Sequence, residues 1–518
     1  MQTATIPFEE TDCFSKAFLT YISQSGKLDK FYRVAPEKSQ FKELITSRDF
    51  SSDKRILLTE TLHRQYSAIT LNPLVSQNID SLKNEKTFTI TTGHQLNIFT
   101  GPLYFIYKIV TVINLCKSLK KAYPDFHFVP VYWMASEDHD FEEISHFHFE
   151  GKKVQWNTDQ RGAVGRFNPK ELQTIASTLP HGAAFFEEAY GKKTLAESAR
   201  AYVNHLFEDE GLVVVDADDS ELKKQLIPVM EDDLFDHHAE KLVLEASNQL
   251  EEHGVKPPVH PRNINFFYLN EDLRERIEKT PEGFAVVDSD IQFSEQEVRQ
   301  LIHKHPEQFS PNVILRPLYQ EMILPNLAYV GGPSELVYWL QLKGVFDHFK
   351  VPFPALMPRN FALVCSRKVQ EKWKKVGLTN RDFFLDSEEA FSKWVQDQST
   401  ATLSYQDELA NLSALEAKIK RKTAIVDPTL SQHIEALHAS FKSRLAKAEK
   451  KLLRAEKRKH LEKQNHIENV KEELFPGGTL QERKINFLNF FLEDPEFIEK
   501  LKETFDPFHF EMYLLFEE

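Results

Sequence analysis

The segment of residues 87–135 constrains the fold of this 518-residue chain more than any other. Residues 87–93 (TFTITTG) and 128–135 (FVPVYWMA) resemble buried strands, and residues 103–121 between them are apolar on nearly every side. Nearly continuous apolar strands are typical of parallel sheets that are covered on both faces, and a helix that is apolar all round has to be buried. The segment therefore predicts a parallel strand–helix–strand unit within an α/β fold.

The same alternation continues along the chain. Further strand-like stretches lie at residues 211–218, 284–290, 327–332 and 353–357. Helical stretches at residues 196–209 and 334–350 lie among them. This order predicts a doubly wound core with a parallel sheet. The more polar segments near residues 151–205 and 230–280 are expected to be insertions on that core.

We expect four parts along the sequence. Residues 1–85 form a helical segment packed on the core, and residues 86–400 form the core with its insertions. Residues 403–470 form a long antiparallel coiled-coil hairpin, and residues 471–518 return to the core because their sequence is apolar again.

Heptad spacing indicates the hairpin. Apolar residues recur at intervals of three, four and seven in two series, one from Tyr405 to Ile419 and one from Phe441 to Ala455. Asp427 and Pro428 lie between the two series and are expected to turn the chain. Residues 441–463 carry ten Lys and Arg against three Asp and Glu, which we interpret as a solvated coiled-coil face.

Charge, cysteine content and apolar run length bear on the partners and the location that we expect for this protein. The net charge of −14 gives no general basic excess for nucleic acid or an anionic membrane, so neither partner is expected. Cys13, Cys116 and Cys365 are few and far apart, which favours a reducing cytoplasm over a disulfide framework. The first residues lack the pattern of a signal peptide, and no apolar run reaches the roughly 18 residues of a transmembrane helix.

Residues 91–102 (TTGHQLNIFTGP) join a predicted strand to the helix at 103–121. Gly101 allows a close backbone approach, and Pro102 suits the first turn of a helix. A helix N-terminus at this point would offer free N–H groups to an anion, whereas a purely conformational turn explains the glycine equally well. The motif is neither a Walker loop nor GxGxxG.

Residues 329–339 (YVGGPSELVYW) repeat this arrangement, with Glu335 in the first turn of the next helix. Two such turns indicate a cleft at the carboxyl ends of the strands. Arg316 and Arg359 flank the second turn, and either one suits a carboxylate or a phosphate. A structural ion pair for each arginine, and a dipole-stabilising role for Glu335, are the alternatives.

Glu137, Asp138 and His139 follow directly after the predicted strand at 128–135. Three ionisable groups at the end of a core strand are costly unless they have a function or satisfied partners. We interpret them as a substrate-holding group or a general base. No third distant ligand motif accompanies them, so no metal site is predicted here.

His146 and His148 lie close by, in a stretch that alternates with Phe147 and Phe149. This alternation predicts a hairpin strand with the two histidines on its polar face.

Four motifs in sequence order carry a family resemblance. They are TTGHQLNIFTGPLYFIYK, VPVYWMASEDHDFEEI, LRPLYQEMILPNLAYVGGPSELVYW and LFPGGTLQERKINF. Together they resemble the bacillithiol biosynthesis cysteine-adding enzymes over nearly the whole chain. The resemblance implies a Rossmann-like core similar to class I aminoacyl-tRNA synthetases, with connecting insertions and a coiled-coil domain that supports a homodimer.

The implied activity is a ligase reaction that forms an amide between the carboxyl group of cysteine and the amine of glucosaminyl-malate. ATP or another nucleotide is the expected cofactor, and ADP is a further nucleotide expected to bind. The activated donor remains open between an adenylate, an acyl phosphate and a group carried by another molecule. Two other functions stay open from the residues alone: a metal-dependent hydrolase using Asp138 and His139, and a non-catalytic coiled-coil scaffold.

The site residues that we expect fall into two groups. The catalytic candidates are His94, Asp138 and His139. The candidates for binding substrate or nucleotide are Gly93, Gln95, Gly101, Pro102, Tyr104, Lys108, Glu137, Arg316, Asn326, Tyr329, Gly331, Gly332, Glu335 and Arg359.

Overall fold

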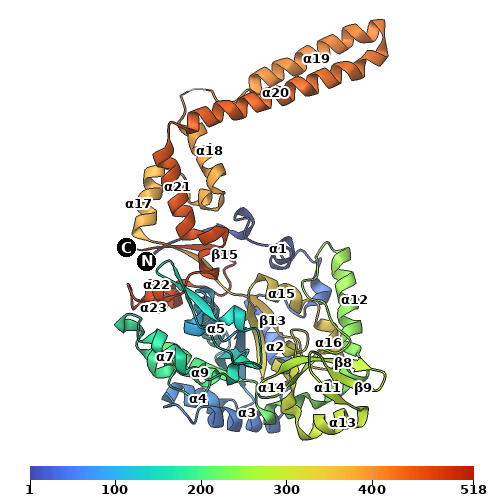
Figure 1. Cartoon of the computed structure of the whole chain (residues 1–518), viewed down its shortest axis with the longest axis vertical. Coiled ribbons are helices and arrows are strands. Elements are labelled where there is room, and N and C mark those ends of the chain that lie inside the picture. The colour runs from blue at the N-terminus through green and yellow to red at the C-terminus, as the bar shows by residue number, and fades with distance from the viewer. Residues whose placement is uncertain (401, 518) are drawn as a thin grey trace.

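A five-stranded parallel sheet forms the core of the computed structural model (Figure 1), which describes residues 1–400 and 402–517. The strands lie in the order β13-β12-β2-β3-β6, and every adjacent pair is parallel. They are β2 (Thr87–His94), β3 (His127–Met134), β6 (Val213–Asp216), β12 (Asn326–Gly331) and β13 (Ala355–Pro358). The predicted α/β fold is confirmed, and five of the six predicted strands belong to this sheet.

Helix α5 (Tyr104–Ala122) connects β2 to β3 and packs against both strands. Thirteen of its 19 residues are buried, which confirms the prediction from its apolar sequence. Val112 and Leu115 of the helix belong to one apolar cluster with Phe88 and Ile90 of β2. This packing fixes the start of α5 beside the carboxyl end of β2.

A second sheet of five antiparallel strands lies between β6 and β12 in the sequence. Its order is β10-β9-β8-β7-β11, from β7 (Phe266–Leu269), β8 (Arg274–Thr280), β9 (Gly283–Val286), β10 (Gln292–Phe293) and β11 (Phe309–Pro311). The strand predicted at residues 284–290 is β9, so its assignment to the parallel core was wrong. Burial alternates along β9, as in a strand with one covered face.

Helices surround both sheets. Near the second sheet lie α10 (Ser220–Lys223), α11 (Ile227–Phe235), α12 (His238–Glu252) and α13 (Glu295–Lys304). In the sequence, α14 (Arg316–Ile323) precedes β12, and α15 (Pro333–Trp339) and α16 (Lys343–His348) follow it. The single helix predicted at residues 334–350 is therefore two helices, with buried Leu340 and Leu342 continuing the apolar pattern across the break.

The segment between β3 and β6 begins with α6 (Phe141–Ile144) and an antiparallel hairpin of β4 (His146–Phe149) and β5 (Lys152–Gln155). In β4 the phenylalanines are buried and the histidines half-buried, so the predicted hairpin strand is confirmed. The segment continues through α7 (Lys170–Ala176), α8 (Phe185–Ala189) and α9 (Leu195–Phe207).

The two ends of the chain meet in a third sheet, of order β1-β15-β14 (Figure 1). It consists of β1 (Gln2–Pro7), β14 (Phe361–Cys365) and β15 (Glu511–Phe516). After β1 the N-terminal segment is helical, with α1 (Lys16–Ile22), α2 (Phe41–Ser47), α3 (Ser52–Gln65) and α4 (Pro73–Ser81). The strand β1 was missed because its sequence, QTATIP, is short and mostly polar.

A long helical hairpin projects from the body (Figure 1). It consists of α19 (Gln406–Val426) and α20 (Ser431–Lys457) and stands on α17 (Arg367–Val376), α18 (Ser387–Gln398) and α21 (Leu461–Leu474). The chain then returns to the core through α22 (Leu488–Phe491) and α23 (Phe497–Thr504). The hairpin is shorter than residues 403–470, because α21 packs on α17 and α18 instead of extending α20.

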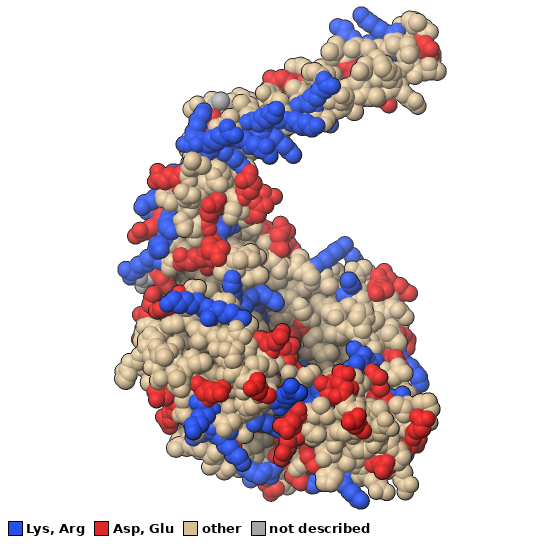
Figure 2. All heavy atoms as spheres, in the orientation of Figure 1, with Lys and Arg blue, Asp and Glu red and all other residues tan. Residues whose placement is uncertain are grey.

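The seam between α19 and α20 is partly polar. Glu416 makes ion pairs with Lys420 at 2.9 Å and with His438 of α20 at 2.8 Å. Ile419 and Phe441, which belong to the two heptad-spaced series, are 39% and 50% exposed. Figure 2 shows that Lys and Arg side chains gather on the surface of this hairpin. No helix among the described residues is long and apolar enough to cross a bilayer.

Candidate functional site

A cavity of about 300 Å³ opens at the carboxyl ends of β2, β3 and β12. The chain order of the sheet reverses between β2 and β12, because β3 and β6 lie on one side of β2 while β12 and β13 lie on the other. Ligands of open α/β sheets bind at such a reversal, and the cavity has the size of a small-molecule site.

Ten predicted site residues line this cavity. They are Gly93, His94, Gln95, Tyr104, Lys108, Glu137, Asp138, Arg316, Tyr329 and Glu335. The sequence interpretation missed the other nine lining residues, which are Trp133, Met134, Ala135, Glu143, Arg274, Pro311, Asn312, Val313 and Tyr338.

Gly93 keeps the end of β2 open. A Cβ atom at this position would lie 3.4 Å from the Tyr329 hydroxyl and 3.6 Å from Arg316 Nη1. Any larger side chain would therefore fill the space between the strand and these two polar groups.

A buried ion pair forms one wall of the cavity. Lys108 Nζ lies 2.7 Å from Glu335 Oε1 and donates to the Gly93 carbonyl oxygen at 2.8 Å. Glu335 also accepts hydrogen bonds from the Tyr329 hydroxyl at 2.6 Å and from Gly332 N–H at 3.2 Å. Burial alone would raise the pKa of Glu335, but Lys108 and the hydrogen bonds hold it below its ordinary value. Glu335 is therefore ionised and caps its own helix.

Arg316 is a cation without an acidic partner. Its Nη1 donates to Gln320 Oε1 at 3.1 Å, and its guanidinium group lies over the rings of Trp133 and Tyr329. Among the described residues no carboxylate forms an ion pair with it. Arg316 thus offers its charge to an anionic ligand in the cavity.

His94 is held as a neutral imidazole. Its ring stacks on Phe105 at 5.2 Å and contacts Tyr104 at 5.1 Å. Burial lowers the pKa of His94 well below its ordinary value, and the charges of Lys108 and Arg359 act in the same direction. Its Nε2 is buried and has no hydrogen-bond partner within the described residues, so a ligand is the available partner.

Asp138 is held as a carboxylate on the opposite side. It accepts hydrogen bonds from Gln95 Nε2 at 2.5 Å and from its neighbour His139 N–H at 2.7 Å. Burial alone would raise the pKa of Asp138, but the charge of Arg274 and these hydrogen bonds lower it. Asp138 is therefore suited to hold a cationic or hydrogen-bond-donating group.

His139 lies outside the main cavity, in an adjoining surface groove that also contains Asp138 and Arg274. Arg274 Nη1 lies 2.7 Å from His139 Nδ1 and 3.4 Å from Asp138 Oδ1. A guanidinium group therefore occupies the space where a metal ion shared by Asp138 and His139 would have to bind.

Glu137 lines the cavity and pairs with a lysine buried behind the cavity wall. It forms an ion pair with the fully buried Lys223, which also lies 3.6 Å from Asp218 Oδ1. Burial raises the pKa of Glu137, and Lys223 partly offsets that rise. This group fixes the base of the cavity.

Four other predicted residues are structural. Asn326 accepts hydrogen bonds from the hydroxyls of Thr89 and Thr91 at 3.2 and 2.9 Å inside the sheet. Gly331 and Gly332 form the turn into α15 beneath Glu335. Arg359 makes a buried ion pair with Glu482, with Nη1 and Oε2 3.0 Å apart.

Gly101 and Pro102 lie under the C-terminal segment. The backbone of Gly101 has a φ of 66°, and a Cβ there would lie 2.4 Å from Asn97 Cβ. The Leu103 N–H donates to the Ile485 carbonyl oxygen at 2.8 Å. The expectation of free N–H groups for an anion at this turn was therefore wrong for Leu103, because the returning chain already pairs with it.

Known proteins resemble this chain over nearly its whole length. A family model for the N-terminal Rossmann-like domain of the bacillithiol biosynthesis protein BshC matches residues 1–360. A second model, for the C-terminal coiled-coil domain of BshC, matches residues 362–517. The chain belongs to the BshC family of bacillithiol biosynthesis proteins.

Individual relatives agree with the family models. A protein of Flavobacterium psychrophilum is 40% identical over 98% of both chains, and one of Cytophaga hutchinsonii is 39% identical over the same share. A protein of Chloroherpeton thalassium is 30% identical over 99% of this chain and all of its own. Each relative carries the name "Putative cysteine ligase BshC".

Membership of the BshC family confirms the resemblance seen in the four sequence motifs. It gives no support to a metal-dependent hydrolase or to a non-catalytic scaffold, and the contact of Arg274 with Asp138 and His139 argues against the hydrolase independently. The likeness of the core to class I aminoacyl-tRNA synthetases stays a prediction.

Proposed function

We propose that this protein is a ligase that joins the carboxyl group of cysteine to the amine of glucosaminyl-malate. The observation that carries the proposal is the full-length similarity to relatives named as cysteine ligases of the BshC family. The cavity at the reversal of the sheet is the proposed site, because it combines an unpaired cation with ionised carboxylates.

The charges of the cavity suit these substrates. Arg316 would bind a carboxylate, and Asp138 would hold an ammonium group or a sugar hydroxyl. His94 Nε2 would accept a hydrogen bond from the attacking amine, since the neutral imidazole has a free lone pair. His139 lies in the adjoining groove and would contact only the part of a substrate that extends outward.

Amide formation requires an activated carboxyl group. The C–N bond forms as the amine attacks the cysteine carboxyl carbon, one carboxyl oxygen leaves with the activating group, and the amine loses a proton. We propose ATP as the activator, which would supply a phosphoryl or adenylyl group to that oxygen. Arg316 fits a phosphate, whereas Glu335 already caps the N-terminus of α15.

Two further features belong to the proposal. A cytoplasmic location agrees with three free cysteines, Cys13, Cys116 and Cys365. A homodimer through α19 and α20 agrees with the apolar side chains that these helices expose, including Leu415 and Leu437 at 52% and 55%.

A reconstituted reaction tests the activity. Purified protein is incubated with cysteine, glucosaminyl-malate and ATP, and the thiol product is measured by mass spectrometry, with a parallel reaction that adds cell extract as a source of another activated donor. We expect Arg316→Met to lower product formation about 100-fold, as for loss of a charged group that holds the reacting centre. The exposed Arg381, which does not line the cavity, provides the matched control Arg381→Met.

Product from the wild type and from Arg381→Met, but not from Arg316→Met, supports the proposal and its site. Absence of product from the wild type with both donor sources contradicts the activity. Equal product from all three proteins contradicts the site while leaving the activity standing.

A further inference from the structure

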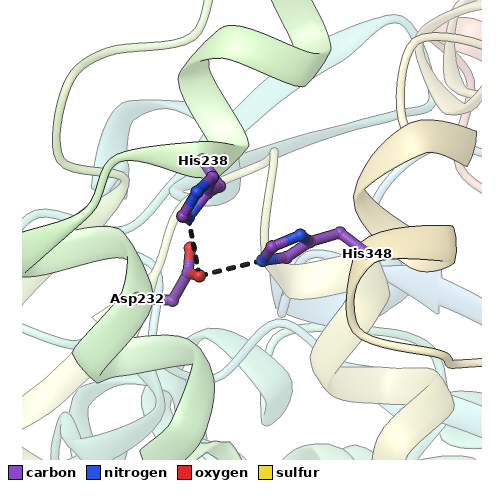
Figure 3. A group of neighbouring side chains, drawn as sticks. All are labelled: Asp232, His238 and His348. Atoms are coloured by element: carbon purple, nitrogen blue, oxygen red, sulfur yellow. Dashed lines mark hydrogen bonds and ion pairs between the residues drawn. The ribbon is translucent and has the colours of Figure 1, made fainter.

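Two consecutive helices and a third one more than 100 residues further along the chain bring two histidines and one aspartate together outside the cavity. Figure 3 shows Asp232 of α11, His238 at the start of α12 and His348 at the end of α16. His238 Nδ1 and His348 Nε2 each lie 2.9 Å from Asp232 Oδ2. One potential ligand atom from each residue lies within 4.8 Å of the other two.

This group is separate from the proposed active site, since none of its members lines that cavity. Among the described residues it is the one group of three or more His, Cys, Asp and Glu side chains with ligand atoms this close. The side chains of Asp232, His238 and His348 are 14%, 43% and 32% exposed. An ion could therefore enter from solvent, and a water molecule could complete its coordination.

The hydrogen bonds of Asp232 leave part of its carboxylate unused. Both imidazoles approach Oδ2, whereas Oδ1 is buried and has no hydrogen-bond partner within the described residues. A buried carboxylate oxygen without a partner is costly. A cation bound by the carboxylate would satisfy it.

The donor set is that of a transition metal. Two imidazole nitrogens and one carboxylate oxygen suit Zn²⁺, which binds such ligands at about 2.0–2.2 Å with tetrahedral geometry. Tetrahedral ligands at that radius are separated by about 3.3 Å. The 2.9 Å separations from Asp232 Oδ2 are a few tenths of an ångström shorter than this, and the two imidazole nitrogens lie within 4.8 Å of each other. Metal binding therefore requires the imidazoles to rotate toward a common centre.

We propose that Asp232, His238 and His348 bind one Zn²⁺ ion per chain, with water as the remaining ligand. The ion would join α11 and α12, which lie beside the antiparallel sheet, to α16, which follows the helix that carries Glu335. The ion would thereby link the region of the second sheet, which supplies Arg274, to the region after β12, which supplies Glu335. Because the ion binds the folded protein in preference to the unfolded chain, it would also stabilise the fold.

Metal titration of the full-length protein without an affinity tag tests this site. The protein is stripped with a chelator, dialysed, and titrated with Zn²⁺ by calorimetry, and with Co²⁺ to follow ligand-field absorption. We expect one ion per chain, a tetrahedral Co²⁺ spectrum, and a Tm that rises by about 2 °C with excess Zn²⁺. His348→Ala and Asp232→Asn should each weaken Zn²⁺ binding at least about 10-fold and remove the Tm rise.

His303 supplies a matched control. It lies 2.9 Å from Glu231 in another exposed histidine–carboxylate pair, but no third ligand from the described part of the chain accompanies that pair. His303→Ala should bind Zn²⁺ as the wild type does. The metal-free Tm of each variant, compared with that of the wild type, separates loss of a ligand from loss of folding.

Two results would overturn the proposal. One is a wild type that takes up no stoichiometric Zn²⁺, which would leave a hydrogen-bonded trio only. The other is equal binding by His348→Ala, Asp232→Asn and the wild type, which would place the ion elsewhere.

Discussion

At the scale of single residues, the cavity holds some charges fixed and leaves others available. Lys108 and Glu335 neutralise each other in its wall, and Arg274 is engaged by Asp138 and His139. Arg316 retains an unpaired positive charge, and His94 stays neutral. The charge of Arg316 is therefore available to attract an anionic substrate, because the other charged side chains already pair with one another.

His94 predicts a specific dependence of stability on pH. Its pKa is depressed in the folded state, so the unfolded chain binds the proton more tightly. The stabilisation is fully present above the unfolded pKa of about 6.5 and is lost as pH falls toward the lower folded value. At pH 5.5 the loss relative to pH 7.5 should reach about 1 kcal/mol.

Urea denaturation of the wild type and His94→Gln at pH 7.5 and 5.5 measures this contribution. Gln removes the titrating ring together with its contacts to Phe105 and Tyr104, but the loss of these contacts does not depend on pH, so the comparison of the two pH values isolates the titration. The variant should lose less stability on acidification than the wild type. An identical loss in both proteins would show that His94 is not held neutral.

The pair of Lys108 and Glu335 predicts a loss of stability when one partner is removed. Glu335→Gln leaves the buried ammonium group without an opposite charge, with neutral oxygens such as the Gly93 carbonyl as its acceptors. Breaking a buried pair costs about 3–5 kcal/mol, and the 27% exposure of the Glu335 side chain reduces the expected cost to about 2 kcal/mol. Urea denaturation at pH 7.5 provides the measurement.

The double variant Lys108→Met/Glu335→Gln is the control for that experiment. Removing both charges should recover part of the loss, because no uncompensated charge remains buried. Additive losses from the two substitutions would show that the two side chains do not interact in solution.

The candidate site could be predicted only in part from the sequence. Gln95 and Asp138 follow core strands directly, so their place at the carboxyl edge followed from local pattern. Arg274 reaches Asp138 across 136 residues from another sheet, and no local signal marks such a contact. Asn326 occurs in an equally suggestive motif, but its side chain satisfies hydroxyl groups inside the sheet.

At the scale of elements, local sequence pattern likewise predicts the strands but not all of their neighbours in a sheet. The strand-like sequences of β2 and β3 predicted that both strands exist, and the apolar helix that connects them predicted their parallel pairing. The strand β9 has a similar apolar sequence, but its pairing with β8 and β10 depends on tight antiparallel connections. Composition identifies a strand more readily than it identifies the neighbours of that strand.

A buried ion pair helps to hold the C-terminal segment on the core. Arg359 and Glu482 are 3% and 0% exposed in their side chains, and Glu482 also accepts a hydrogen bond from the backbone N–H of Ala362 at 3.3 Å. Glu482→Gln leaves a guanidinium group buried without its carboxylate. We expect the free energy of unfolding to fall by about 3 kcal/mol, measured by urea denaturation.

The adjacent Arg483 is exposed and has no ion pair with any described residue, so Arg483→Gln is the matched control. That substitution should change stability by less than about 0.5 kcal/mol. A similar small effect from Glu482→Gln would mean that the returning segment is held by its apolar contacts instead.

At the scale of the whole molecule, the helical hairpin has too little buried surface to be explained as part of the body. No residue of α19 is buried, and the seam with α20 contains Glu416 and His438. Each helix also exposes apolar residues one turn apart, Leu415 and Ile419 on α19 and Leu437 and Phe441 on α20. Such exposed apolar positions favour burial against another chain.

The hairpin therefore predicts a dimer that a single charge can weaken. Light scattering after gel filtration should give a mass of twice the 60.2 kDa of one chain for the wild type.

Phe441→Glu, at a side chain that is 50% exposed, should shift the mass toward one chain, because the interface would bury an unpaired carboxylate. Ser443→Glu adds the same charge at an exposed polar position and should remain dimeric. Both variants should keep the wild-type Tm of the body, since α19 and α20 contribute little to its core. A wild type with the mass of one chain would contradict the dimer, and an unchanged mass for Phe441→Glu would place the interface elsewhere.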